Sequence, residues 1–146
     1  MNVTIRKAKP EDFFAVLELN KEFSVFQKTP EKVSITLEQM KSDANLFQCF
    51  IAENDACDIV GFASFFFAYY SWTGKALYLD DLYVKEAYRK HKVGSDLLNT
   101  IIGHAKKENC TKMRWQVSRW NNNAIEFYKK MGAEIEETEI NCDLKL

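Results

Sequence analysis

The chain has 146 residues, 47% apolar and 28% charged, and its 20 Lys and Arg nearly balance its 21 Asp and Glu. This length and composition are typical of one packed domain spanning residues 1–146. A net charge of −1 argues against nonspecific nucleic-acid binding, which needs an excess of cations. The longest apolar run, Phe62 to Tyr70, is about half as long as a membrane-spanning helix, and the opening residues lack the apolar core of a secretory signal. We therefore expect a cytoplasmic protein with no membrane or nucleic-acid partner.

The first predicted elements are a short strand and two helices. Residues around Val3 alternate apolar and polar, as in a strand. Pro10 suits a first helical turn, and apolar spacing predicts a helix over residues 10–26. The segment Thr36–Gln39 has the spacing of a capping box and predicts a shorter helix ending near Ala44.

The middle of the chain changes to a β period. Residues 47–53, 59–70 and 76–84 are rich in β-branched and aromatic residues. Polar turns separate them at residues 54–58 and 72–75. The three runs predict an antiparallel meander.

The second half alternates helix and strand. Residues 94–107 form an amphipathic pattern, and residues 113–117 alternate as a strand. A last helix over residues 122–131 should end at Gly132 in a left-handed cap, and residues 134–146 predict one or two edge strands. The order of elements predicts a mixed α/β fold with a central, mostly antiparallel sheet and about four helices.

Cysteines and histidines give no metal site. The four cysteines lie far apart without CxxC spacing, which favours reduced, buried thiols. His91 and His104 are too isolated to form a zinc site.

A cationic loop follows the third long strand. The strand ends at Val84, residues 89–92 carry Arg, Lys, His and Lys, and a helix begins near Gly94. A helix N-terminus beside cations can bind a phosphate or pyrophosphate. The alternative is a solvated charged loop that connects strand and helix.

A second segment places polar residues at a strand-to-helix junction. Asn121 and Asn123 lie at the junction and Tyr128 lies one turn beyond Ala124. Tyr128 is either a core aromatic or a phenol that gives a proton to a departing thiolate.

Together these segments resemble the Gcn5-related N-acetyltransferase (GNAT) family. The coenzyme-loop pattern Q/R-x-x-G-x-G/A is met at Arg89 and Gly94, and residues 120–133 match WNxxAxxFYxxxGA. The likeness runs nearly end to end, includes residues 59–84, and is greatest to the diamine (spermidine/spermine) N-acetyltransferases. It implies an acyl-CoA N-acyltransferase fold, acetyl-CoA as co-substrate, no metal, and direct attack by a small primary amine in a ternary complex.

The resemblance also implies where the coenzyme binds. The strand at residues 82–84 would pair with the pantetheine arm, the loop would wrap the pyrophosphate, and residues of the second segment would hold the thioester end. Tyr128 stands at the position of the family's general acid. The implied coenzyme-binding residues are Leu82, Tyr83, Val84, Arg89, Lys90, His91, Lys92, Val93, Gly94, Ser95, Asn121, Asn123, Ala124 and Tyr128.

The amine site is implied in the same way. Asp80 stands where the polyamine enzymes have a glutamate that accepts the amine proton through water. Asp80 and Asp81 are strand neighbours, so we expect their side chains on opposite faces and assign Asp80 to the reaction centre. Trp72 can hold an ammonium by cation–π attraction. The implied substrate-binding residues are Trp72, Asp80, Asp81, Gln27, Trp115 and Gln116.

The sequence departs from the family pattern at three places. Lys90 and Lys92 replace glycines of the coenzyme loop, where glycine would permit positive φ. Gln27 replaces a glutamate, and residues 136–146 lack the expected tryptophan. Because carboxylates for a long polycation are missing, we expect a diamine, an amino-acid amine or a lysine-like thioether.

Three alternatives remain open on the sequence alone. The chain could acetylate a protein or peptide N-terminus, serve as a coenzyme-binding regulatory module without turnover, or be a structural partner domain. By analogy with the family we expect a homodimer, paired through residues 134–146.

Overall fold

The computed structural model describes residues 2–146, which form two compact units, one ending at Trp115 and the other running from Gln116 to Leu146. The first unit contains a five-stranded sheet in sequence order. Strands β1 (Val3–Lys7), β2 (Gln48–Asn54), β3 (Ile59–Tyr70) and β4 (Gly74–Val84) pair antiparallel, and β5 (Lys112–Arg114) pairs parallel with β4. The predicted meander is confirmed.

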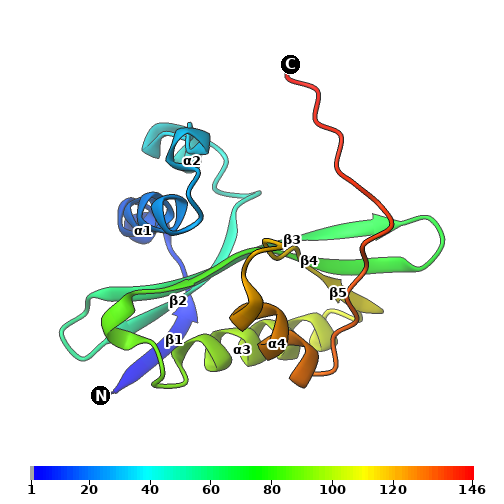
Figure 1. Cartoon of the computed structure of the whole chain (residues 1–146). Helices are drawn as coiled ribbons and strands as arrows, with labels where there is room; N and C mark the ends of the chain where they lie inside the picture. The colour runs from blue at the N-terminus through cyan, green and yellow to red at the C-terminus, as the bar shows by residue number, and fades with distance from the viewer. Residues whose placement is uncertain (1) are drawn as a thin grey trace. The chain divides into compact units, whose positions relative to one another are not determined.

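Helices cover both faces of this sheet. Figure 1 shows α1 (Phe13–Phe26) and α2 (Leu37–Ser42) on one side and α3 (Val93–Lys107) on the other. On the first side, Ile51 and Phe62 are fully buried in a cluster with Phe13 of α1. On the second, the ring of His104 lies 5.6 Å from that of Phe50. These two packings identify which face each strand residue presents. Short 3-10 turns occupy Pro10–Asp12 (η1), Pro30–Lys32 (η2) and Glu86–Tyr88 (η3).

The helix starts largely follow the predicted caps. The predicted helix over residues 10–26 begins as η1 and continues as α1. At α2 the Thr36 hydroxyl accepts a hydrogen bond from the Gln39 backbone N–H at 3.1 Å. The Gln39 side chain instead donates to Asp43 at 3.4 Å, so the structure records the Thr36 half of the predicted capping box.

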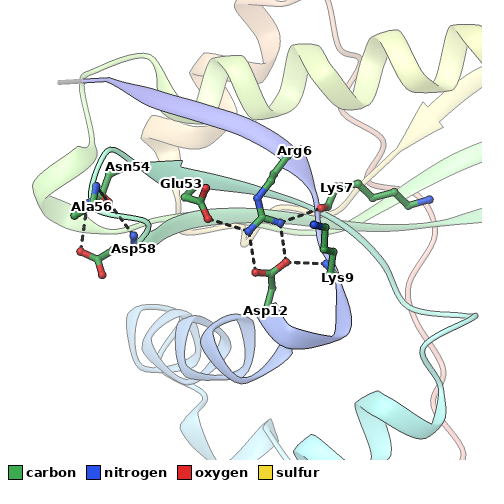
Figure 2. A network of polar contacts seen from close by, with 8 residues as sticks. All are labelled: Arg6, Lys7, Lys9, Asp12, Glu53, Asn54, Ala56 and Asp58. Atoms are coloured by element: carbon green, nitrogen blue, oxygen red, sulfur yellow. Dashed lines mark hydrogen bonds and ion pairs between the residues drawn. The ribbon is translucent and has the colours of Figure 1, made fainter.

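An ion-pair network joins β1, η1 and β2 (Figure 2). The Arg6 guanidinium donates to both carboxylate oxygens of Asp12, at 2.8 and 3.0 Å, and to Glu53 at 2.8 Å. The backbone N–H of Lys9 also donates to Asp12, at 2.7 Å. Arg6 therefore holds the pKa of Asp12 below its ordinary value, and the network fixes the first helix against the sheet.

The second unit departs from prediction at its end. Helix α4 (Asn122–Lys130) and the left-handed Gly132, with φ of 93°, confirm the predicted helix and cap. The edge strands predicted over residues 134–146 are wrong, because residues 116–146 contain no β-strand with which they could pair. Strand β5 is also shorter than predicted and ends before Trp115. In both places the alternating pattern lacked a hydrogen-bonded neighbour.

Candidate active site

Strand β4 carries an irregularity at the acidic pair. Ser64 of β3 is opposite Asp81, but the next residue, Phe65, is opposite Leu79. Asp80 therefore has no direct partner on β3 and forms a β-bulge. Bulges re-aim side chains locally and are frequent beside active sites.

The bulge places Asp80 and Asp81 on the same face of the sheet. Leu79 is opposite Phe65, whose ring lies 5.4 Å from the ring of His104 on α3. Leu82 is opposite Ala63, which is opposite Phe50, another neighbour of His104. Because residues 79 and 82 both face α3, the two residues between them face the α1 and α2 side. The expectation that they point to opposite faces is wrong, since regular alternation stops at a bulge.

This arrangement raises the pKa values of both carboxyl groups. Partial burial raises the pKa of Asp81 to about 6, and the nearby charge of Asp80 adds to the shift. Asp80 is exposed as a whole residue, yet enough protein surrounds its carboxyl group that desolvation also raises its pKa. A carboxylate with a raised pKa accepts a proton more readily near neutral pH.

The edge of β4 is open beside this pair. Strand β5 pairs with residues 76–78 only, so within the described chain no strand covers the β5 side of residues 79–84. The predicted coenzyme strand, residues 82–84, lies in this open stretch. One of its carbonyls is already used, because the Val84 oxygen accepts a hydrogen bond from Arg89 Nε at 2.9 Å.

The predicted anion loop has the geometry of an anion-binding nest. Lys90 and Lys92 both adopt the left-handed conformation with φ of 65°, and Lys92 caps α3. The first α-helical bond runs from Asp96 N–H to the Lys92 carbonyl at 2.8 Å. The preceding backbone N–H groups, through Ser95, therefore have no partner inside the helix. Such groups, the helix dipole and two ammonium side chains fit a pyrophosphate.

Arg89 serves the fold through its side chain. Besides its bond to Val84, its guanidinium carbon lies 5.1 Å from the ring centre of Phe26 and 5.4 Å from that of Tyr83. The Arg89 side chain thus ties the loop to α1 and β4. The Arg89 backbone N–H is also used, because it donates to the Glu86 carbonyl at 3.1 Å. The coenzyme role predicted for Arg89 therefore has no unpaired backbone N–H behind it.

In the second unit, Asn121 is the N-cap of α4 and Tyr128 lies within the helix. The Asn121 side chain caps the helix by accepting from the Ala124 N–H at 3.3 Å. Asn123 is exposed, and Tyr128 is partly buried. Burial raises the pKa of Tyr128, so the phenol keeps its proton at neutral pH.

The other residues predicted to bind the substrate lie on separate elements of the structure. Trp72 is 97% exposed at the turn between β3 and β4, and the strand from Gly74 to Asp80 spans about 20 Å. The structure does not bring Trp72 and Asp80 together within one chain. Gln27 is the C-cap of α1, Trp115 follows β5, and the exposed Gln116 donates to Asn141 at 3.0 Å.

The sequence analysis missed several residues on the face that holds Asp80. Tyr78 stacks on Phe66 with ring centres 4.9 Å apart, and Arg114 is opposite Tyr78 on β5. Tyr70 lies under two cations, Lys112 and Arg114. The alternation of Lys112 and Arg114 was the available signal, but their neighbours depend on strand register.

Among residues 2–146 no three His, Cys, Asp or Glu side chains gather as metal ligands would. In the same residues no helix has the length and apolar character needed to cross a membrane.

Comparisons with known proteins identify the family of this chain. Residues 13–133 match the model of the acetyltransferase (GNAT) family. A thialysine N-epsilon-acetyltransferase of Sus scrofa is 32% identical over 144 residues, covering 90% of this chain and 84% of that protein. A human spermidine/spermine N(1)-acetyltransferase-like protein 1 is 35% identical over 139 residues, covering 88% of this chain and 20% of that protein. An aminoglycoside acetyltransferase from a soil metagenome shares the fold, with a TM-score of 0.80, 17% identity, and coverage of 99% and 96% of the two chains.

Proposed function

Because the chain belongs to the acetyltransferase (GNAT) family, we propose that it transfers acetyl from acetyl-CoA to a primary amine of a small molecule. The amine would be a diamine, a polyamine or a lysine-like amine. The thialysine and spermidine/spermine enzymes similar to this chain support that range. The observation that carries the proposal is the carboxylate pair at the β4 bulge, beside an open strand edge and an anion-binding nest.

The residues present fit the coenzyme. Backbone N–H groups of the loop from Lys90 to Ser95 would hold its pyrophosphate, with Lys90 and Lys92 as counter-charges and His91 at the loop surface. The backbone of residues 82–84 would pair with its pantetheine arm, and Asn121, Asn123 and Ala124 would flank its thioester end. Acetyl-CoA supplies an activated acetyl thioester.

Asp80 would act as the base. An alkylammonium with a pKa of about 10.4 is protonated at neutral pH and cannot attack until it loses a proton. The Asp80 carboxylate is exposed and one methylene shorter than glutamate, so a bridging water would carry that proton. Asp81, on the same face, would attract the ammonium.

Tyr128 would act as the acid. As the amine nitrogen bonds to the acetyl carbon and the carbon–sulfur bond breaks, the leaving sulfur takes up a proton. A phenol is a weaker acid than a thiol by about 1.5 pKa units. Proton transfer from Tyr128 to the leaving thiolate is therefore slightly unfavourable and needs close positioning of the two groups.

The position of Trp72 favours a site formed by two copies of the chain. Trp72 is too far along the hairpin to reach Asp80 of its own chain, so its place beside an amine would require a second copy. We therefore keep the homodimer as part of the proposal. All four cysteines are free, which fits the reducing cytoplasm as its location.

The proposal is tested by calorimetry with acetyl-CoA and by thiol release with diamines, polyamines and amino-acid amines. Binding with thiol release on a small amine supports it. Binding without turnover on any amine would indicate a regulatory coenzyme-binding module. Turnover on peptide N-termini alone would indicate a protein acetyltransferase, and absence of binding would indicate a structural domain.

A further inference from the structure

A cationic and aromatic strip continues from the acidic pair along the same face of β4 and β5. Tyr78 lies two residues before Asp80 and shares its face, because Phe66 stacks on Tyr78 and Phe65 faces α3. Next to Tyr78, on β5, is Arg114. The strip thus passes from two carboxylates, over aromatic rings, to positive charge.

The positive end is organised around one ring. Lys112 Nζ lies 4.4 Å from the ring centre of Tyr70, and the Arg114 guanidinium carbon lies 4.9 Å from it. Among residues 2–146 neither cation forms an ion pair with a carboxylate. Two cations held on one ring repel each other unless an anion lies between them. The arrangement therefore favours an anionic group at this end.

Tyr78 lies between the two charged ends. The charge of Asp80 raises the pKa of its phenol and the charge of Arg114 lowers it, with burial the largest cause of the net rise. Both charges are therefore near Tyr78, Asp80 two residues along β4 and Arg114 beside it on β5. The ring provides an apolar surface on which an aliphatic chain can lie.

The spacing of the two ends matches an amino-acid side chain. Asp80 follows Tyr78 by two steps along β4, at most about 6.7 Å, and a neighbouring strand adds about 4.8 Å at a right angle. The backbone positions of Asp80 and Arg114 are thus about 8 Å apart. An extended lysine-like chain places its side-chain amine roughly 7 Å from its carboxylate.

We propose that the acceptor is an amino acid with a side-chain amine, whose α-carboxylate binds Arg114 and Lys112 while the amine reaches Asp80. This inference rests on the acetyl transfer proposed above and narrows its substrate class. A diamine or polyamine would place an ammonium against the two cations, and that repulsion would select against it. Arg114 is then a specificity-determining residue, suited by its planar fork to a carboxylate.

The test compares L-lysine with cadaverine, which has the same chain and amine but lacks the carboxylate. We expect the unchanged enzyme to prefer lysine by at least about tenfold in kcat/KM. Arg114→Gln should lower kcat/KM for lysine by about 10- to 100-fold, mainly through KM, and leave cadaverine within about twofold. Arg114→Glu should raise kcat/KM for cadaverine, because a carboxylate would attract its second ammonium group.

Two further variants serve as controls. Lys112→Gln should also lower kcat/KM for lysine, and it replaces the Arg114 variants in the test if those do not fold. Lys107→Gln removes an exposed cation of α3, on the opposite face, and should change neither substrate. A matching unfolding midpoint shows that an effect is local.

The outcomes separate this inference from the proposed function. Preference for cadaverine or spermidine, or equal losses for lysine and cadaverine in Arg114→Gln, overturns the inference and leaves the acetyltransferase intact. Absence of thiol release with every amine overturns the proposed function, and the inference with it.

Discussion

Asp80 and Asp81 are consecutive residues of β4, and both face the side of the sheet covered by α1 and α2. The bulge opposite Ser64 makes this possible, because it adds one residue to β4 and interrupts its alternation. Two carboxyl groups are therefore held together in a partly desolvated place, where burial raises the pKa of each and the charge of Asp80 raises that of Asp81 further. The following predictions begin from this pair.

Asp81→Asn should stabilise the protein above pH 6. The folded-state pKa of Asp81 is about 6 against an ordinary 3.8, so the folded chain holds this proton more tightly than the unfolded chain. The ionised side chain therefore costs stability that appears as pH rises from about 4 to about 6. At pH 7.5 the gain should be up to about 3 kcal/mol, and at pH 3.5 it should vanish.

Urea unfolding at the two pH values measures this difference. Asp55→Asn, in the exposed turn between β2 and β3, is the matched control and should show no pH-dependent gain. A gain for Asp81→Asn that is equal at both pH values would mean that desolvation of its charge is not the cause.

Asp80→Asn should slow catalysis most where the amine is protonated. If Asp80 accepts the amine proton through water, its amide should lower kcat by about 100-fold at pH 7, and by less as pH nears 10. Asp81→Asn should act more on KM, because its charge attracts the ammonium. Rate profiles between pH 6.5 and 10 decide this; superimposable curves for Asp80→Asn and the unchanged enzyme would remove the base from Asp80.

Tyr128→Phe should lower kcat by about 10²–10⁴-fold while acetyl-CoA affinity stays similar, because the ring is kept and the donated proton is lost. Thiol release and calorimetry measure the two quantities. Tyr69→Phe removes a phenol hydroxyl from the β3–β4 hairpin, where the residue is 82% exposed, and should leave kcat unchanged. Full turnover by Tyr128→Phe would contradict its role as acid.

Two variants of Lys92 should separate the effect of its backbone strain from the effect of its charge. Lys92→Gly removes both the ammonium and the penalty of φ at 65°, whereas Lys92→Ala removes the ammonium alone. We expect the glycine variant to be more stable than the alanine variant by about 1 kcal/mol. Both should bind acetyl-CoA more weakly if the ammonium contacts phosphate. Equal unfolding midpoints would mean that the left-handed turn costs nothing here.

Asp12→Asn should destabilise the fold by about 3 kcal/mol at pH 7, because Arg6 would lose its bidentate partner in a partly buried place. Asp12 has a lowered pKa, so its contribution is present above pH 4 and disappears as pH falls through the folded-state pKa. Glu53→Gln, on the same guanidinium, should cost less than about 1 kcal/mol. Denaturant midpoints at pH 7 and pH 3 compare the variants.

Local pattern in the sequence was enough to predict most elements of this fold. Apolar period and turn residues located the strands at residues 47–53, 59–70 and 76–84, the helices at residues 10–26 and 94–107, and the cap at Gly132, because these depend on near neighbours. Asp80, the loop at residues 89–95 and Tyr128 were also named from sequence, by their likeness to a family. Their catalytic and binding roles stay predictions.

Tertiary structure decided what depends on pairing between distant strands. A bulge is a relation between β3 and β4 and leaves no local signal, so the shared face of Asp80 and Asp81 was predicted wrongly. The edge strands expected over residues 134–146 failed because alternation specifies a strand only where a neighbour accepts its hydrogen bonds. The strip from Asp80 to Arg114 likewise exists only through the register of β4 and β5. Neighbouring residues determine local conformation. The free energy of the whole packed unit determines strand register, and register decides which charged side chains lie side by side across a sheet.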